Sequence, residues 1–178
     1  TIAILPKLPY SRAIAQKARE CSHEVILHMP LEPREKFPRY EELTIYANMG
    51  RADILERLNA AIDSVPYIKG ISNHMGSKAT EDERLMRILF SRLKTKDVYF
   101  LDSLVTGNSV CRRLAASMGV RFAARAVFLD NNNDTEYIKL QLRQLLTLAK
   151  KRKSAVGIGH DRPLTIKTIA LMLPEFQR

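Results

Sequence analysis

Three histidines and two aspartates of this chain stand at the ends of short strand-like segments. VILH ends at His28, KGISNH at His74 and AVGIGH at His160, while VYFLD ends at Asp102 and AVFLD at Asp130. Imidazole and carboxylate groups bind divalent metals and transfer protons near neutral pH. Because parallel α/β folds build their active sites at the carboxyl ends of strands, we expect these groups to serve metal binding or acid–base chemistry.

The first two histidines are the candidate metal ligands. Two neutral imidazoles and one carboxylate form a catalytic zinc-type set that leaves one position open for water. His28 and His74 would supply the imidazoles, and Glu32, four residues after His28, could ligate or orient. Asp102 and Asp130 are the best third ligands, although neither has a diagnostic spacing. For each lone histidine, a structural, hydrogen-bonded role is the alternative.

The third histidine and the two aspartates are candidates for catalysis. A histidine pKa near about 6.5 suits proton transfer at neutral pH, so His160 could act as a general acid. Asp102 and Asp130 would orient a histidine or contact substrate. An aspartate at a strand-to-helix junction is also a common helix N-cap, which is the structural alternative for both.

Further polar residues beside these positions are candidates for substrate binding. They are Glu32, Asn73 and Ser77 near the first two histidines, and Asn131 in the asparagine-rich turn after Asp130. Ser77 and Thr80 could instead cap the following helix, and Asp134 or Thr135 could cap the helix after the turn. Gly76 would allow a tight backbone turn after His74.

The elements that must position these residues alternate between strand and helix patterns. Apolar runs predict strands, and apolar residues at i, i+3, i+4 and i+7 predict helices. Six strands, each followed by a helix, imply a parallel sheet with right-handed crossovers, as in an open doubly wound sheet or an incomplete barrel. The predicted strands are 2–5, 25–28, 68–72, 98–101, 121–129 and 154–158; helices are predicted at 11–21, 53–65, 81–94, 109–118, 135–151 and around 166–173; and 30–52 is a long loop.

Composition limits the classes of partner. The chain has 178 residues and a net charge of +10, from 29 basic and 19 acidic residues. The positive charge is spread over the predicted helices, and only LAKKRK at 148–153 is a cluster, so we do not expect nucleic acid as a partner. No apolar run approaches the roughly 18–20 residues of a transmembrane helix.

Cys21 and Cys111 lack CxxC spacing and are predicted to be buried free thiols. Nothing indicates an oligomeric state.

The segments HEVILHMPLEP, SNHMGSK, FLDS, VFLDN and AVGIGH, in this order, resemble the divergent polysaccharide deacetylases. These are distant relatives of the chitin and peptidoglycan deacetylases. The resemblance covers nearly the whole chain and implies a single domain over 1–178 with a distorted, incomplete (β/α) barrel of the polysaccharide deacetylase type. The family's first strand, which carries an Asp-Asp pair, and its closing strand are expected to lie outside this chain.

The same resemblance implies an activity. Better characterised relatives remove N-acetyl groups from a polysaccharide with a divalent metal, usually zinc, and an extracytoplasmic location follows from such a substrate. By resemblance, His28 matches the first histidine of an HxxxH metal motif, and Glu32 falls where the second would stand. His74 matches a replacement ligand and His160 the late catalytic histidine. Because the motif is broken, a non-catalytic glycan- or envelope-protein-binding module is the alternative.

Overall fold

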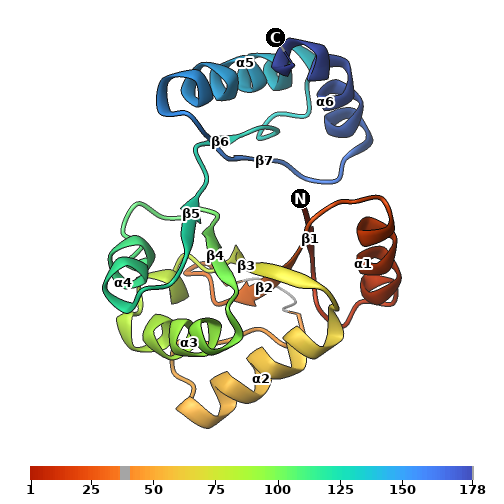
Figure 1. Ribbon diagram of the computed structural model, residues 1–178. Coiled ribbons are helices and arrows are strands. Elements are labelled where there is room, and N and C mark those ends of the chain that lie inside the picture. Colours follow the sequence, from red (N-terminus) through yellow and green to blue (C-terminus); the bar gives the residue numbers. More distant parts are fainter. Residues whose placement is uncertain (37–40, 178) are drawn as a thin grey trace. The chain divides into compact units, whose positions relative to one another are not determined.

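The computed structural model describes residues 1–36 and 41–177, which form two compact units (Figure 1). The first unit spans Thr1–Ala123 and the second begins at Ala124. Each unit has its own cluster of buried apolar side chains. Helices alternate with strands along the chain, so the predicted α/β class is confirmed. The interpretation of residues 1–178 as one domain stays a prediction.

The first unit is built on a five-stranded sheet in the order β1-β2-β3-β4-β5. The pairs from β1 to β4 are parallel, as expected for strands joined by helical crossovers. Among the described strands β1 and β5 remain edges, so this sheet does not close and the prediction of an incomplete barrel is confirmed. The strands are β1 (Ile2–Ile4), β2 (Val25–Leu31), β3 (Ile68–Met75), β4 (Tyr99–Asp102) and β5 (Phe122–Ala124).

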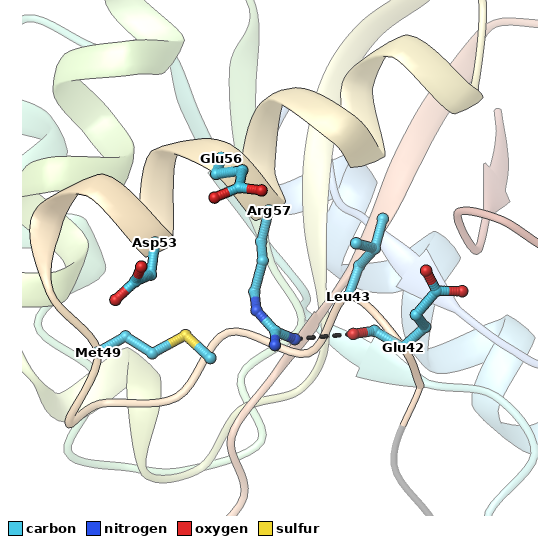
Figure 2. A pocket seen from close by; sticks show the side chains of 6 residues that line it. All are labelled: Glu42, Leu43, Met49, Asp53, Glu56 and Arg57. Atoms are coloured by element: carbon cyan, nitrogen blue, oxygen red, sulfur yellow. Dashed lines mark hydrogen bonds between the residues drawn. The ribbon is translucent and has the colours of Figure 1, made fainter.

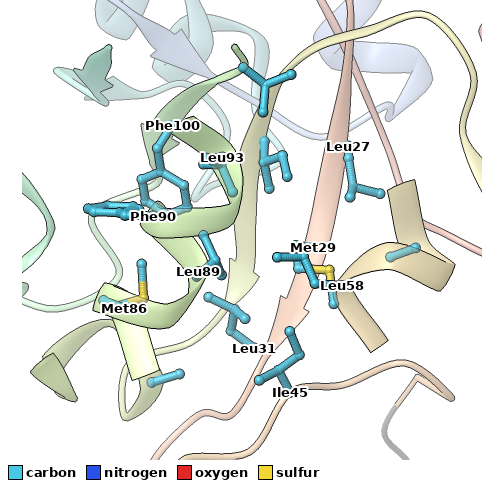
Figure 3. Close-up of a cluster of buried hydrophobic side chains, with 14 of the residues drawn as sticks. Leu27, Met29, Leu31, Ile45, Leu58, Met86, Leu89, Phe90, Leu93 and Phe100 are labelled. Carbon is cyan, nitrogen blue, oxygen red and sulfur yellow. The ribbon is translucent and has the colours of Figure 1, made fainter. Parts of the chain in front are cut away.

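The helices of the first unit bury one face of the sheet. Leu27 and Met29 of β2 and Phe100 of β4 lie in one apolar cluster with Leu58 and Leu89 from two helices (Figure 3). Successive strand residues point to opposite faces, so His28 points away from the cluster that its neighbours join. The helices are α1 (Ser11–Glu20), α2 (Arg51–Ser64), α3 (Glu83–Lys96) and α4 (Cys111–Met118), with a short 3-10 helix, η1 (Ala79–Glu81), before α3.

Strand β2 runs further than its sequence pattern predicts. It continues through Pro30 to Leu31, so the predicted loop over 30–52 is partly wrong. Ile45 forms a bridge with Leu31, and its backbone N–H donates to Pro30 O. Pro30 is tolerated because only its carbonyl is needed at this position. Residues 37–40 of the predicted loop lie outside the described residues.

The single strand predicted over 121–129 is wrong. It is two strands of different sheets: β5 is the last strand of the five-stranded sheet and ends at the boundary residue Ala124, and β6 (Val127–Phe128) pairs in parallel with β7 (Gly157–Ile158) in the second unit. Both pieces are apolar and only Arg125 and Ala126 lie between them, so the pattern predicted a single strand. The second unit is completed by α5 (Thr135–Arg152) and α6 (Pro163–Phe176).

The predicted N-cap of one helix is confirmed, and the predicted N-cap of another is wrong. Asp134 is the N-cap of α5, as predicted. The caps predicted for Ser77 and Thr80 are wrong, because α3 begins after Asp82, whose carboxylate accepts from Leu85 N at 2.8 Å. An aspartate directly before the first helical turn satisfies donors that residues further back do not reach.

The two cysteines differ in exposure. Cys21 is exposed just after α1, so its predicted burial is wrong, whereas Cys111 is buried as predicted. Burial raises the pKa of the Cys111 thiol to about 12. Because the thiolate is the reactive form, we expect a thiol reagent to modify the exposed Cys21 but not the buried Cys111 in the folded protein. After unfolding, the reagent should modify both. Mass spectrometry of the labelled peptides checks this, and rapid native labelling of Cys111 would contradict it.

Candidate functional site

Two of the predicted metal ligands meet on neighbouring strands of the first unit. The β2–β3 register sets His28 beside Ser72 and Pro30 beside His74. The His28 and His74 ring centroids are 5.1 Å apart, with an interplanar angle of 68°. His28 Nδ1 lies 2.8 Å from Ser72 Oγ, so ligand binding by this ring would fall to Nε2.

His74 carries a buried ring nitrogen that lacks a hydrogen bond. Among the buried side-chain nitrogen and oxygen atoms of residues 1–36 and 41–177, Nε2 of His74 is the one that has no hydrogen-bond partner. Glu41 Oε1 nevertheless lies 3.2 Å from it. The two observations agree if the carboxylate is close to the nitrogen but off the axis along which a hydrogen bond would form. Buried polar atoms are nearly always hydrogen-bonded, so this nitrogen is an exception within the described residues.

Behind the histidines, Asn73 and Asp102 hold the loop that follows β4. Asn73 Oδ1 accepts from Ser103 N at 2.8 Å, and Asp102 accepts from Leu104 N at 2.8 Å and from Ser109 Oγ at 2.6 Å. Both side chains are almost completely buried. Asp102 does not cap α4, whose N-cap is Val110. The geometry shows that Asn73 and Asp102 organise the loop; their roles in substrate binding and catalysis stay predictions.

Glu32 uses both carboxylate oxygens inside the first unit. Its Oε1 accepts from Lys78 Nζ at 2.8 Å and its Oε2 from Ala47 N at 2.7 Å. It therefore links β2 to the loop after β3 and to the segment 41–47. Ser77 takes part in the same link, because its Oγ accepts from Arg34 N at 2.9 Å. Substrate binding by Glu32 and Ser77 stays a prediction.

Gly76 makes the turn that was expected after His74. Its φ is +93°, and a Cβ there would lie 2.9 Å from Leu31 Cβ. Both the positive φ and the close approach exclude a side chain without strain. The end of β3 is therefore fixed where it passes the end of β2.

The second unit joins the other predicted pair, Asp130 and His160. Asp130 is fully buried two residues after β6, and its Oδ1 lies 3.1 Å from His160 Nδ1. Its Oδ2 accepts from His160 N at 2.9 Å and from Thr165 Oγ at 2.8 Å. The His160 side chain is half exposed, at 53%. The pair combines an orienting carboxylate with an imidazole that solvent can reach.

Burial alone would raise the pKa of Asp130, but hydrogen bonds from Thr165 and from the backbone and ring of His160 outweigh it and hold the pKa below its usual range. Asp130 is thus a carboxylate at neutral pH. The ring of Phe128 packs edge-on against the His160 ring, with centroids 5.4 Å apart, and covers one side of the imidazole. Asn131 is exposed directly after Asp130, and its predicted substrate contact stays a prediction.

Three residues of these sites were not found from sequence. Ser72 has a signal, because it alternates with His74 along β3. Thr165 lies in the first turn of α6 and has only its position after His160 to mark it. Glu41 has no local signal, since its contact depends on how the segment after Leu31 returns to the sheet. In the part of the chain that the structure describes, no three His, Cys, Asp or Glu side chains are arranged to hold a metal ion.

A cavity of about 330 Å³ lies beside α2, and its lining combines three acidic side chains, two apolar side chains and Arg57 (Figure 2). Arg57 Nη1 donates to Glu42 O at 2.7 Å across it. None of the predicted site residues lines this cavity. The lining residues are Glu42, Leu43, Met49, Asp53, Glu56 and Arg57. None of the described helices combines the length and the apolar character that a bilayer crossing needs.

Comparison with known proteins gives one family match. Residues 1–178 match the sequence pattern described as divergent polysaccharide deacetylase. The uncharacterized protein YibQ of Escherichia coli K12 is 36% identical over 173 residues, which are 97% of this chain and 54% of that protein. An uncharacterized protein of Haemophilus influenzae Rd is 37% identical over 169 residues, 95% of this chain and 60% of that protein. The chain thus spans little more than half the length of these relatives.

A solved structure has the same fold. The crystal structure of an uncharacterized protein from Agrobacterium tumefaciens C58 matches with a TM-score of 0.93 and covers 97% of this chain and 71% of its own. Sequence identity is 20%, so this likeness establishes the fold alone. It agrees with the α/β architecture that the strand and helix patterns predict.

Proposed function

We propose that this chain, which belongs to the divergent polysaccharide deacetylase family, is part of a metal-dependent hydrolase that removes N-acetyl groups from a polysaccharide. The observation that carries the proposal is the buried Nε2 of His74, which has no hydrogen bond and lies beside the His28 ring. A structural histidine would have its buried nitrogen satisfied, whereas a metal ligand needs that lone pair.

His28 and His74 would hold the divalent ion, and imidazole nitrogens with a carboxylate suit zinc. Such an ion supplies Lewis acidity toward the acetamide carbonyl and an acidified water. Ser72 contributes by engaging His28 Nδ1 at 2.8 Å, which fixes the plane of the ring. Glu32 and Asn73 fix the neighbouring segments, because Glu32 accepts from Ala47 N and Asn73 accepts from Ser103 N.

His160 is proposed as the general acid that protonates the amine leaving group. When Nδ1 donates to the Asp130 carboxylate, the exchangeable proton of the imidazolium is at Nε2. Asp130 stays ionised because its pKa is held low, and it stabilises the charged ring. The exposure of the His160 side chain lets the proton be replaced from solvent.

The substrate class and the location are proposals from the family. An N-acetylated polysaccharide of the cell envelope is the proposed substrate, with an extracytoplasmic site of action. The family match supports the polysaccharide, and the relatives' names assign no activity. Since the chain spans only part of these relatives, activity is to be measured on the full-length protein.

A binding module without turnover is the second candidate. It is favoured by one observation: Glu32, which stands where the family has a second metal histidine, uses both carboxylate oxygens for Lys78 and Ala47. Release of acetate from N-acetylated oligosaccharides separates the two candidates. Saturable glycan binding without acetate release would favour the module.

The first test is the metal content of the purified full-length protein, measured by mass spectrometry beside a His28→Ala/His74→Ala double variant. We expect near-stoichiometric metal in the parent and its loss in the variant, because two of the ligating nitrogens are removed. His23→Ala, which removes an exposed histidine outside the site, is the matched control and should keep its metal. A parent that contains no metal after zinc is supplied would rule out the hydrolase mechanism.

A further inference from the structure

We propose that Met75, Leu104 and Val105 form an apolar contact surface for the polysaccharide, against which the C–H face of a sugar ring packs. The inference rests on the polysaccharide ligand of the proposed function, and it applies to the hydrolase and to the binding module alike. Met75 is the last residue of β3, and Leu104 lies two residues after β4. The β3–β4 register pairs Ser72 with Leu101, so Met75 falls opposite Leu104 three positions further on.

The backbone of Met75 and of Leu104 is left-handed, with φ of +52° and +48°. Side chains of this size rarely adopt such angles, because the Cβ approaches the backbone too closely. Ser22, with φ of +58°, follows the C-cap of α1, where a left-handed residue is a common way for a helix to end. Met75 and Leu104 stand at strand ends and have no such local reason. Strain of this kind persists where the surrounding structure imposes it, and it clusters at functional sites.

Two buried side chains impose these conformations. Asn73 is completely buried, and its Nδ2 donates to Met75 O at 2.7 Å while its Oδ1 accepts from Ser103 N at 2.8 Å. Ser103 Oγ in turn donates to Asn73 O at 2.8 Å, which ties the two strand ends together. Asp102 is 1% exposed, and its Oδ1 accepts from Leu104 N at 2.8 Å. Because these bonds lie in the interior, both strained residues are held in fixed positions.

The core of the first unit does not account for the two side chains. Among the described residues, neither Met75 nor Leu104 belongs to the buried apolar cluster or to the partly buried side chains packed against it. Both are partly exposed, and Val105 is 43% exposed. Glycine adopts a positive φ without strain, as Gly76 does directly after Met75. Large apolar side chains at strained, partly exposed positions are therefore explained by a contact that forms outside the core.

The chemistry of this surface selects the part of the ligand that it contacts. Its side chains gain free energy when apolar surface is removed from water, and they form no hydrogen bonds with hydroxyl groups. A pyranose ring presents such apolar surface as a face of C–H groups. Because Val105 is open to solvent, the surface suits this flat face, whereas an isolated methyl group would be better held in an enclosed cavity. His74 directly precedes Met75, so the bound ring lies next to the candidate site.

The test is a calorimetric titration of the full-length protein with an N-acetylated chito-oligosaccharide, for the parent and for variants of Leu104. We expect Leu104→Ala to raise the Kd roughly 5–10-fold, because most of the apolar contact of this side chain is lost. Leu104→Met keeps an apolar side chain of similar size and should bind like the parent. Leu104→Gly should bind as weakly as Leu104→Ala, yet its urea midpoint should be the higher of the two, since glycine relieves the strain.

Ser22→Gly is the matched control, because it relieves a left-handed residue at an exposed position of the same unit and should leave the Kd unchanged. A purely structural role of Leu104 would make affinity follow stability, so a Leu104→Gly variant that binds more tightly than Leu104→Ala would overturn the inference. Binding by Leu104→Ala at the Kd of the parent would also overturn it and leave the proposed function intact. A parent that binds no N-acetylated oligosaccharide would overturn both.

Discussion

A His160→Ala variant is expected to release acetate from an N-acetylated oligosaccharide about 10²–10⁴-fold more slowly than the parent protein, which is the range for loss of a general acid. The effect should fall mainly on kcat, because proton transfer to the leaving amine takes place in the transition state. The half-exposed imidazole held by Asp130 is the structural basis of this expectation. Steady-state kinetics of the full-length protein measures it.

The matched control for this prediction is His23→Ala, which removes an exposed imidazole that has no proposed role. Its rate should equal that of the parent. Metal content should remain near that of the parent in both variants, which separates the loss of an acid from the loss of the metal. If His160→Ala retained the rate of the parent, His160 would not be the acid, whatever the metal content.

Replacing Asp130 with alanine is expected to destabilise the protein by about 2–6 kcal/mol, because the backbone N–H of His160 and the hydroxyl of Thr165 lose their acceptor, at about 1–3 kcal/mol each. Asp130→Asn should cost less stability. Its amide oxygen can still accept from both donors, while its NH2 would face His160 Nδ1 and favour the wrong tautomer. We therefore expect Asp130→Asn to lower kcat strongly with a small change in the urea midpoint.

The pH dependence of stability tests the same carboxylate. The pKa of Asp130 in the folded protein is lowered, so the unfolded chain binds a proton more readily. Its contribution is present in full above the ordinary aspartate pKa of about 3.9 and is lost as the pH falls through the lower folded value. The parent should lose this stability in acid, and Asp130→Ala should lack that part of the pH dependence.

The control for Asp130 is Asp161→Ala, which removes an exposed carboxylate two residues from α6. An exposed substitution of this kind is usually within about 0.5 kcal/mol of the parent. Urea unfolding at pH 7 and in acid gives both the midpoint and its pH dependence. Equal midpoints for Asp130→Ala and Asp161→Ala would show that the buried network does not stabilise the second unit.

Local patterns were sufficient for the order of elements but not for their sheets. Alternation and helical spacing are properties of neighbouring residues, so strands such as 68–72 and helices such as 135–151 were predictable within a few positions. The split of 121–129 into β5 and β6 was not predictable, because both pieces remain apolar. Cys21 likewise has an apolar spacing on α1 but stands at the end of the helix, where nothing covers it.

The sequence by itself determined which polar groups follow or interrupt the apolar runs, such as His28 and Asp130, but not where the strands end, since β2 continues past His28 to Leu31. Only the tertiary structure decided which of those groups meet. Asp130 and His160 are 30 residues apart and His28 and Ser72 are 44 apart, and both contacts follow from parallel strand register. Glu41 reaches His74 because Glu32 and Arg57 hold its segment, and such long-range contacts leave no periodic trace in the chain.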